Sequence, residues 1–161
     1  MNKLTKVYDR VSNLLSRLQS PLLLAIRLYW GIELALDGWR KLHHLDNVGQ
    51  YFATLNLPMP AQTAVFVSLV ELIGGIALVV GLFTRLTAFV LFINMTVAFL
   101  AAEKDAFFSI ISDPDKFQAA SAYNDWFAAL LILILGPGFL AVDTLLRRLF
   151  VAEGERAHSL V

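Results

Sequence analysis

The sequence predicts an all-α integral membrane protein, a four-helix bundle with an N-terminal amphipathic interfacial helix. Of its 161 residues, 58% are hydrophobic and only 16% are charged, and the mean hydropathy is +0.66, which is outside the usual balance of a soluble domain. Four apolar segments are also long enough to cross a hydrocarbon core, a crossing that takes roughly 20 residues. Short polar or proline-containing segments separate them, as expected for helices joined by turns.

Residues 1–20 have the pattern of an amphipathic helix. Apolar residues recur there at helical spacing and basic residues fall between them, as Leu4, Val7, Val11, Leu14, Leu15 and Leu18 against Lys3, Lys6, Arg10 and Arg17. Two interpretations remain open, a helix lying in the membrane interface and a helix packed beneath the bundle. The segment lacks the continuous apolar stretch and the small-residue cleavage site that a signal peptide needs.

The predicted spans cover residues 21–42, 61–84, 86–102 and 125–146. They form a predicted membrane domain over residues 21–148, followed by a cytoplasmic tail over residues 149–161. The fourth span contains the sequence "GPG", in which Pro137 lacks a backbone donor and predicts a kink.

Basic residues predict the orientation of the chain in the membrane. Cytoplasmic loops carry an excess of lysine and arginine, so both termini are expected in the cytoplasm. The residues on that side are Lys3, Lys6, Arg10, Arg17, Arg85, Arg147, Arg148 and Arg156, and they outnumber Arg40, Lys41, Lys104 and Lys116 on the other.

A group of acidic residues is predicted in the outer half of the membrane. Because a helix rises ~1.5 Å per residue, Glu33, Glu71 and Asp37 come out about 18, 21 and 24 Å above the cytoplasmic face. Arg40 and Lys41 follow on the first span, and Glu33, Asp37 and Arg40 share a helix face. We expect Glu71 to face the interior beside Glu33 or Asp37, with one acid holding a proton, which suits a proton relay or a quinone contact. A purely structural ion-pair network is an equal alternative.

A second group of charges is predicted in the inner half. Arg27 and Asp143 come out about 9 and 6 Å above the cytoplasmic face, so an ion pair between them is expected, with Arg85 within reach at the rim. Charges within spans normally face the bundle interior and form pairs. An architectural clamp is the favoured interpretation, because long arginines reach the headgroups at low cost.

The residue composition argues against several classes of function. The absence of cysteine rules out disulfides and thiolate metal sites, so redox chemistry needs a bound cofactor or a partner. No metal site is predicted, since the neighbouring His43 and His44 point in different directions on a helix. The net charge of zero gives no reason to expect nucleic acid. Asn94, mid-span, is expected to bond across the bundle or to touch a ligand.

At this point the motifs resemble a known family. The segments "RLYWGIELALDGWRKL", "LNLPMP", "VELIGGIALVVGLFTRLT" and "GPGFLAVD" are similar to the DoxX family of small bacterial and archaeal four-helix membrane proteins. The matching positions are Arg27, Gly38, Lys41, Leu57, Pro58, Glu71, Gly74, Gly75, Gly81, Arg85, Gly136, Gly138 and Asp143. This chain departs from the family pattern in having Asp37 where a histidine is common, and "YNDWF" where a glutamate is common.

The resemblance implies a function linked to quinones in the cytoplasmic (inner) membrane. The family is similar to the membrane subunit of thiosulfate:quinone oxidoreductase, and some relatives are linked to oxidative-stress complexes. The expected cofactor is a quinone, and the expected partner is a soluble or membrane oxidoreductase. The chain is also expected to contact membrane lipids and to associate with copies of itself. Glu71, Glu33 and Asp37 are expected to handle protons, while Arg40 or Lys41 orients a polar headgroup or a small anion. The alternative is a non-catalytic scaffold, or a carrier of a small solute or lipid.

Overall fold

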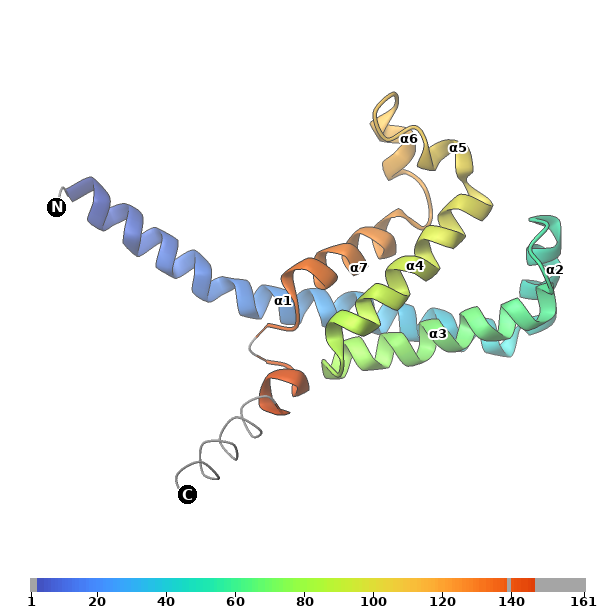
Figure 1. Ribbon diagram of the computed structural model, residues 1–161, viewed down its shortest axis with the longest axis horizontal. Coiled ribbons are helices and arrows are strands. Elements are labelled where there is room, and N and C mark those ends of the chain that lie inside the picture. Colours follow the sequence, from blue (N-terminus) through green and yellow to red (C-terminus); the bar gives the residue numbers. More distant parts are fainter. Residues whose placement is uncertain (1–2, 139, 147–161) are drawn as a thin grey trace, which may run out of the picture.

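The computed structural model describes residues 3–138 and 140–146, with the side chains of residues 3–7 and 17 excepted. Its helices are α1 Lys3–His43, α2 Leu45–Thr54, α3 Pro60–Val80, α4 Thr84–Ala102, α5 Lys104–Phe107, α6 Pro114–Gln118 and α7 Tyr123–Leu135 (Figure 1). All regular structure in the described residues is helical, which confirms the all-α prediction. The predicted tail over residues 149–161 lies outside the described residues.

Helix α1 is one continuous helix of 41 residues, and it begins well away from the other labelled helices in Figure 1. The sequence had predicted two elements here, with a boundary after residue 20. That boundary is not a break in the structure, because α1 passes through Pro21. A proline removes one backbone donor, and the helix tolerates that loss while the flanking turns stay bonded. The placement of residues 3–20 in the membrane interface stays a prediction.

Helices α1 and α3 pack side by side at close range, and glycines make this possible. A Cβ atom at Gly38 would lie 2.4 Å from the backbone nitrogen of Leu72, and one at Gly75 would lie 2.5 Å from that of Ala35. Only glycine fits such a contact, which is typical of helix pairs in membranes. The close seam between the two helices brings side chains of α1 directly against α3.

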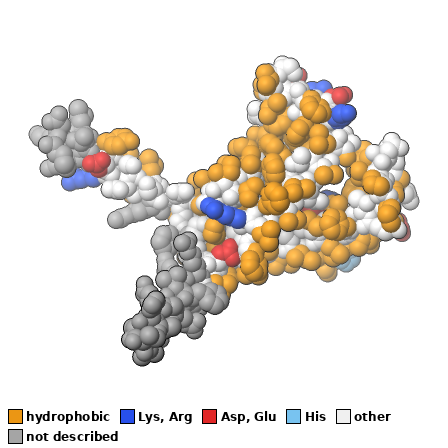
Figure 2. Space-filling view, viewed as in Figure 1, with side chains coloured by type: hydrophobic (Ala, Val, Ile, Leu, Met, Phe, Trp, Pro, Cys, Tyr) orange, Lys and Arg blue, Asp and Glu red, His pale blue; other side chains and the backbone are white. Residues whose placement is uncertain are grey.

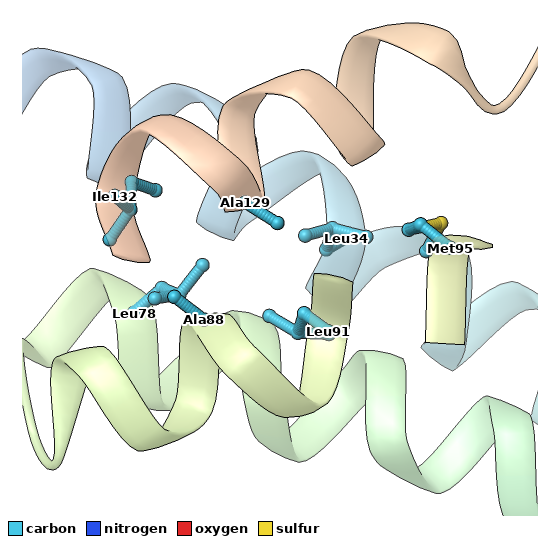
Figure 3. Packing of buried hydrophobic residues seen from close by; sticks show 7 residues of the cluster. All are labelled: Leu34, Leu78, Ala88, Leu91, Met95, Ala129 and Ile132. Carbon is cyan, nitrogen blue, oxygen red and sulfur yellow. The ribbon is translucent and has the colours of Figure 1, made fainter. Parts of the chain in front are cut away.

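Helices α4 and α7 complete the bundle. Figure 3 shows the buried residues where α1, α3, α4 and α7 meet, which are Leu34, Leu78, Ala88, Leu91, Met95, Ala129 and Ile132. The indole nitrogen of Trp126 also donates a hydrogen bond of 2.9 Å to the hydroxyl of Thr96, which ties α7 to α4. The core where these four helices meet is therefore apolar.

Helix α7 ends earlier than the predicted span. It stops at Leu135, because Gly136 has a φ of 83° and Gly138 a φ of 72°, values in the left-handed region that glycine adopts readily. The chain is helical again over residues 142–146. The "GPG" sequence therefore ends the helix rather than kinking it, so residues 125–146 do not form one continuous helix, while their crossing of the membrane stays a prediction.

The end of the bundle that carries α2, α5 and α6, called the α2 end below, is closed by an aromatic cluster. Phe99 is fully buried and stacks on Phe117, with Phe107 and Trp126 packed around them. Glu103 accepts hydrogen bonds of 2.9 and 3.1 Å from the backbone and hydroxyl of Ser121. These contacts fix the segment that enters α7.

The surface of the described part suits a bilayer. Hydrophobic side chains cover much of the face shown in Figure 2, and large apolar residues of α3 and α4 are exposed, among them Phe66, Ile73, Ile76, Leu86, Phe89 and Val97. Of the described helices, α3 and α4 are long and apolar enough to cross a membrane, while α7 is a shorter apolar helix. The count of four spans stays a prediction.

Candidate functional site

The centre of the site is an ion pair between α1 and α3. Glu71 is only 2% exposed, and its two carboxylate oxygens lie 2.5 and 2.6 Å from the ammonium nitrogen of Lys41. Glu71 lies on the α3 face that packs on α1, between Ser68 and Gly75, and the close helix seam lets Lys41 reach it. Glu71 therefore faces the interior, as expected from its sequence.

Asp37 lies beside this pair. It is half-buried and forms an ion pair with Arg40, one turn further along α1. Asp37 is also close enough to Glu71 for the two carboxylates to interact electrostatically. The structure thus brings together Glu71, Asp37, Arg40 and Lys41, four of the residues that the sequence had predicted for one site.

Glu33 does not join them. It shares a helix face with Asp37, but it is exposed on the surface of α1. The reason is the rotation of the helix, because Leu34 and Gly38 define the seam with α3 and successive residues turn by about 100°. Of the two acids of α1, Asp37 lies beside Glu71, whereas Glu33 is exposed and lies nearer to Asp125 of α7.

Asp125 is a site residue that the sequence reasoning missed. It lies in the first turn of α7, in the "YNDWF" sequence noted as a departure from the family pattern. Asp125 is close enough to Glu33, Asp37 and Glu71 to feel their charges, and its Oδ1 atom is buried without a hydrogen-bond partner in the described part of the chain. The available signal was the carboxylate itself, at the start of the last predicted span.

These residues surround a cavity of ≈ 430 Å³, which is called the acidic cavity below. Its charged lining is Asp37, Lys41, Glu71 and Asp125, and its remaining lining comes from α2, α3, α4 and the segment before α7, as Asn47, Val48, Tyr51, Phe52, Val67, Met95, Ala98, Ala102, Ser121 and Ala122. Five helices, α1, α2, α3, α4 and α7, therefore contribute to one hollow at the α2 end of the bundle. The volume lies in the range of small-molecule sites.

An apolar pocket of ≈ 90 Å³ adjoins the acidic cavity. The two share Tyr51, Phe52, Val67, Ala98 and Ala102 as lining residues, and the rest of the apolar pocket is lined mostly by hydrophobic side chains. Asn94 lines the apolar pocket and lies beside Glu71. Its amide nitrogen is buried without an acceptor among the described residues, so the sequence prediction of a bond across the bundle or a ligand contact stays a prediction.

The predicted ion pair between Arg27 and Asp143 is not formed. Arg27 is 1% exposed and donates instead to three backbone carbonyls, those of Leu78 at 3.1 Å, Leu140 at 2.8 Å and Pro137. These carbonyls include two from the irregular segment after α7. Buried backbone groups need hydrogen-bond partners, and Arg27 supplies them for the carbonyls of Pro137 and Leu140 in this irregular segment.

Asp143 has its own backbone partners. Its two oxygens accept hydrogen bonds of 2.7 Å each from the amides of Phe83 and Thr84 at the start of α4. Arg85 is exposed and lies against Gly136. The hydrogen bonds of Arg27 and Asp143 are thus to backbone groups, although the two side chains lie close enough for their charges to attract, and the role of this group as an architectural clamp stays a prediction.

The other polar groups form no second site. The rings of His43 and His44 each bond a backbone carbonyl of α1, at 2.9 Å. Within the described residues, no group of three or more metal-ligating side chains comes together. A larger hollow of ≈ 510 Å³ lies beside α5 and α6, but its lysines and Asp105 are exposed to solvent and it is lined mainly by alanine. The acidic cavity, with its buried ion pair, is the better candidate.

Comparisons with known proteins cover most of the residues of this site. The DoxX family model matches residues 22–104, which include Asp37, Lys41 and Glu71. The inner membrane protein YphA of Escherichia coli (strain K12) is 31% identical over 125 residues, covering 76% of this chain and 88% of that protein. No solved structure matches the chain.

Proposed function

The chain belongs to the DoxX family of membrane proteins, and from this premise we propose that it is an inner-membrane subunit of a quinone-linked redox or oxidative-stress complex. In this proposal the acidic cavity receives the polar head of the quinone. The chain crosses the membrane four times with both termini in the cytoplasm, which places the cavity in the outer half. An oxidoreductase partner exchanges the electrons.

The observation that carries the proposal is the adjacency of a charged cavity and an apolar pocket. A lipid-soluble ligand with a polar ring and an apolar tail needs both environments next to each other. The acidic cavity has ≈ 430 Å³ and a buried ion pair, and the apolar pocket shares five lining residues with it. The residues present therefore fit a quinone head at Glu71, Lys41 and Asp125, with the start of the tail beside Tyr51 and Phe52.

The charges of the cavity suit the exchange of protons. A bound quinone would supply chemistry in which two electrons and two protons move together. Three carboxyl groups line the cavity and one ammonium faces them, so the wall carries more acid than it can neutralise. In a medium of low dielectric such an excess favours a proton shared among the acids. Asp125, whose Oδ1 atom has no hydrogen-bond partner among the described residues, can then take or give a proton, while Lys41 holds Glu71 in place.

Quinone retained by the purified protein tests the proposal. The full chain is purified in detergent, extracted with organic solvent, and its quinone content is measured by mass spectrometry. We expect quinone in near-stoichiometric amounts with the unchanged chain. Glu71→Gln, which keeps the shape of the side chain, is expected to fold but to retain less quinone because it weakens the bond to Lys41.

Asp115→Asn is the matched control, because Asp115 is an exposed acid in α6 outside the cavity. It should retain as much quinone as the unchanged chain. Phospholipid without quinone in every extract would contradict the redox proposal and favour a scaffold or lipid carrier. Equal quinone in Glu71→Gln and the unchanged chain would remove the acidic cavity as its site.

A further inference from the structure

The charged groups of the acidic cavity are mainly hydrogen-bond acceptors, whereas Asn47, Tyr51 and Ser121 in its lining can both donate and accept. Asp37, Glu71 and Asp125 supply three carboxyl groups, while Lys41 is the one basic residue among the lining residues that the structure describes. Ionised carboxylates only accept hydrogen bonds, and an ammonium only donates. A proton on one of the three acids would still leave acceptors in the majority.

The two basic residues near the cavity are already engaged. The ammonium of Lys41 is bonded to both oxygens of Glu71, and Arg40 is paired with Asp37. Arg40 is not among the residues that line the cavity. An anion entering would therefore meet a negative wall whose cations have carboxylate partners. This geometry disfavours the small anion that Arg40 or Lys41 was expected to orient.

A ligand that donates hydrogen bonds matches such a wall. The two oxygens of a quinone ring are carbonyls, which only accept, whereas the two oxygens of the reduced ring are hydroxyls, which donate. We infer that the acidic cavity holds the reduced, hydroxyl-bearing quinol more tightly than the oxidised quinone. This inference rests on the proposed function and adds the oxidation state that the site prefers.

The donor and acceptor balance sets the size of the preference. A site arranged around a ligand hydroxyl discriminates strongly against an analogue that lacks the donor, because the buried acceptors of the site are left unpaired. We expect the quinol to bind at least about tenfold more tightly. Tighter binding of the reduced form raises the midpoint potential of the bound couple, by about 30 mV for each factor of ten in a two-electron couple.

The experiment compares the two oxidation states of one soluble analogue. Decylubiquinone and decylubiquinol are titrated separately, without oxygen, into the full chain in lipid nanodiscs from which native quinone has been removed. Binding is measured by microscale thermophoresis, and the midpoint potential of the bound couple is measured by spectroelectrochemistry. The expected result is a lower Kd for the quinol together with a raised midpoint potential.

Variants of Asp125 test the cause of the preference. Asp125→Asn replaces one carboxylate oxygen by an amide group that donates hydrogen bonds. The ratio of the quinone Kd to the quinol Kd should therefore fall toward one. Asp125→Glu keeps the acceptors and should keep the preference. Asp46→Asn removes an exposed acid of α2 that does not line the cavity, and it should change neither Kd.

The results distinguish the preference for quinol from the proposed binding of quinones as such. Equal binding of both forms, or tighter binding of the quinone, overturns the inference and leaves the proposed function standing. Failure of both forms to bind overturns the proposed function as well. A quinol preference that survives unchanged in Asp125→Asn while Asp125→Glu loses it would also overturn the inference, since the acceptors would not be its cause.

Discussion

The ammonium of Lys41 lies between the two carboxylate oxygens of Glu71, at 2.5 and 2.6 Å, so a residue near the end of α1 is bound to the middle of α3. Glu71 is 2% exposed while the side chain of Lys41 is 33% exposed. The acid is thus the buried partner, and the lysine reaches it from the cavity. The pair both joins the two helices and forms a wall of the acidic cavity.

Removal of the lysine should destabilise the bundle. Lys41→Met leaves Glu71 buried without its cation, and breaking a buried pair in this way typically costs 3–5 kcal/mol. Because Lys41 is partly exposed, we expect a smaller loss, of about 2–4 kcal/mol. Thermal or denaturant unfolding of the protein in nanodiscs measures it. The double variant Lys41→Met with Glu71→Gln should recover part of the loss, and a double variant less stable than Lys41→Met alone would argue against an ion pair.

The glycines of the α1–α3 seam should resist substitution. A Cβ atom at Gly38 or Gly75 would lie within 2.6 Å of backbone atoms of the facing helix, so Gly38→Ala and Gly75→Ala must push the helices apart. We expect losses of about 1–3 kcal/mol, as for other overpacked cores. Gly49→Ala is the control, since its Cβ would meet nothing closer than 3.6 Å. Equal stability of all three variants would show that the seam is looser than described.

Arg27 should be essential for the stability of the fold but should not affect ligand affinity. Arg27→Met would leave the carbonyls of Leu78, Pro137 and Leu140 without their partner, and the expected loss is at least about 3 kcal/mol. Arg27→Lys should be intermediate, because an ammonium cannot reproduce the spread of guanidinium donors. Unfolding curves measure both, with the exposed Arg10→Met as control. In the protein that does fold, the ratio of quinol to quinone affinity should be unchanged.

The orientation of the chain is open to a direct assay. Basic residues predict that both termini lie in the cytoplasm. Fusions of alkaline phosphatase and of green fluorescent protein after residue 161 should give fluorescence and no phosphatase activity, while a phosphatase inserted between Asp113 and Pro114 should be active. Active phosphatase at the C-terminus would invert the topology and place the acidic cavity toward the cytoplasm.

Much of the fold could be predicted because a membrane restricts the choices. Long apolar segments predicted α3 and α4 closely, and the interior position of Glu71 followed from the cost of a buried charge. The end of α7 could not be predicted as well, because a proline between two glycines either kinks or ends a helix, and packing decides which. The continuity of α1 through Pro21 depends in the same way on the turns around it.

The composition of the site was harder to predict than its depth. Heights along the helices placed Glu33, Asp37 and Glu71 at one level, but height says nothing about rotation. The contact of Gly31 and Gly38 with α3 fixes that rotation and turns Glu33 outward. The partners of Arg27 could not be predicted either, because they are backbone carbonyls and a pattern of charged residues does not reveal them. Asp125 was not predicted as a site residue because a single acid in the first turn of a helix is common, where it stabilises the helix dipole.

Photoaffinity labelling shows where the quinone head binds. An azido-quinone is reduced or oxidised, added to the full chain in nanodiscs, activated by light, and its attachment sites are mapped by mass spectrometry. We expect labels on the walls of the acidic cavity, at residues such as Tyr51, Val67 and Ala98, and we expect decylubiquinol to compete with this labelling. Labels confined to the hollow beside α5 and α6, at Lys104 or Lys116, would contradict it.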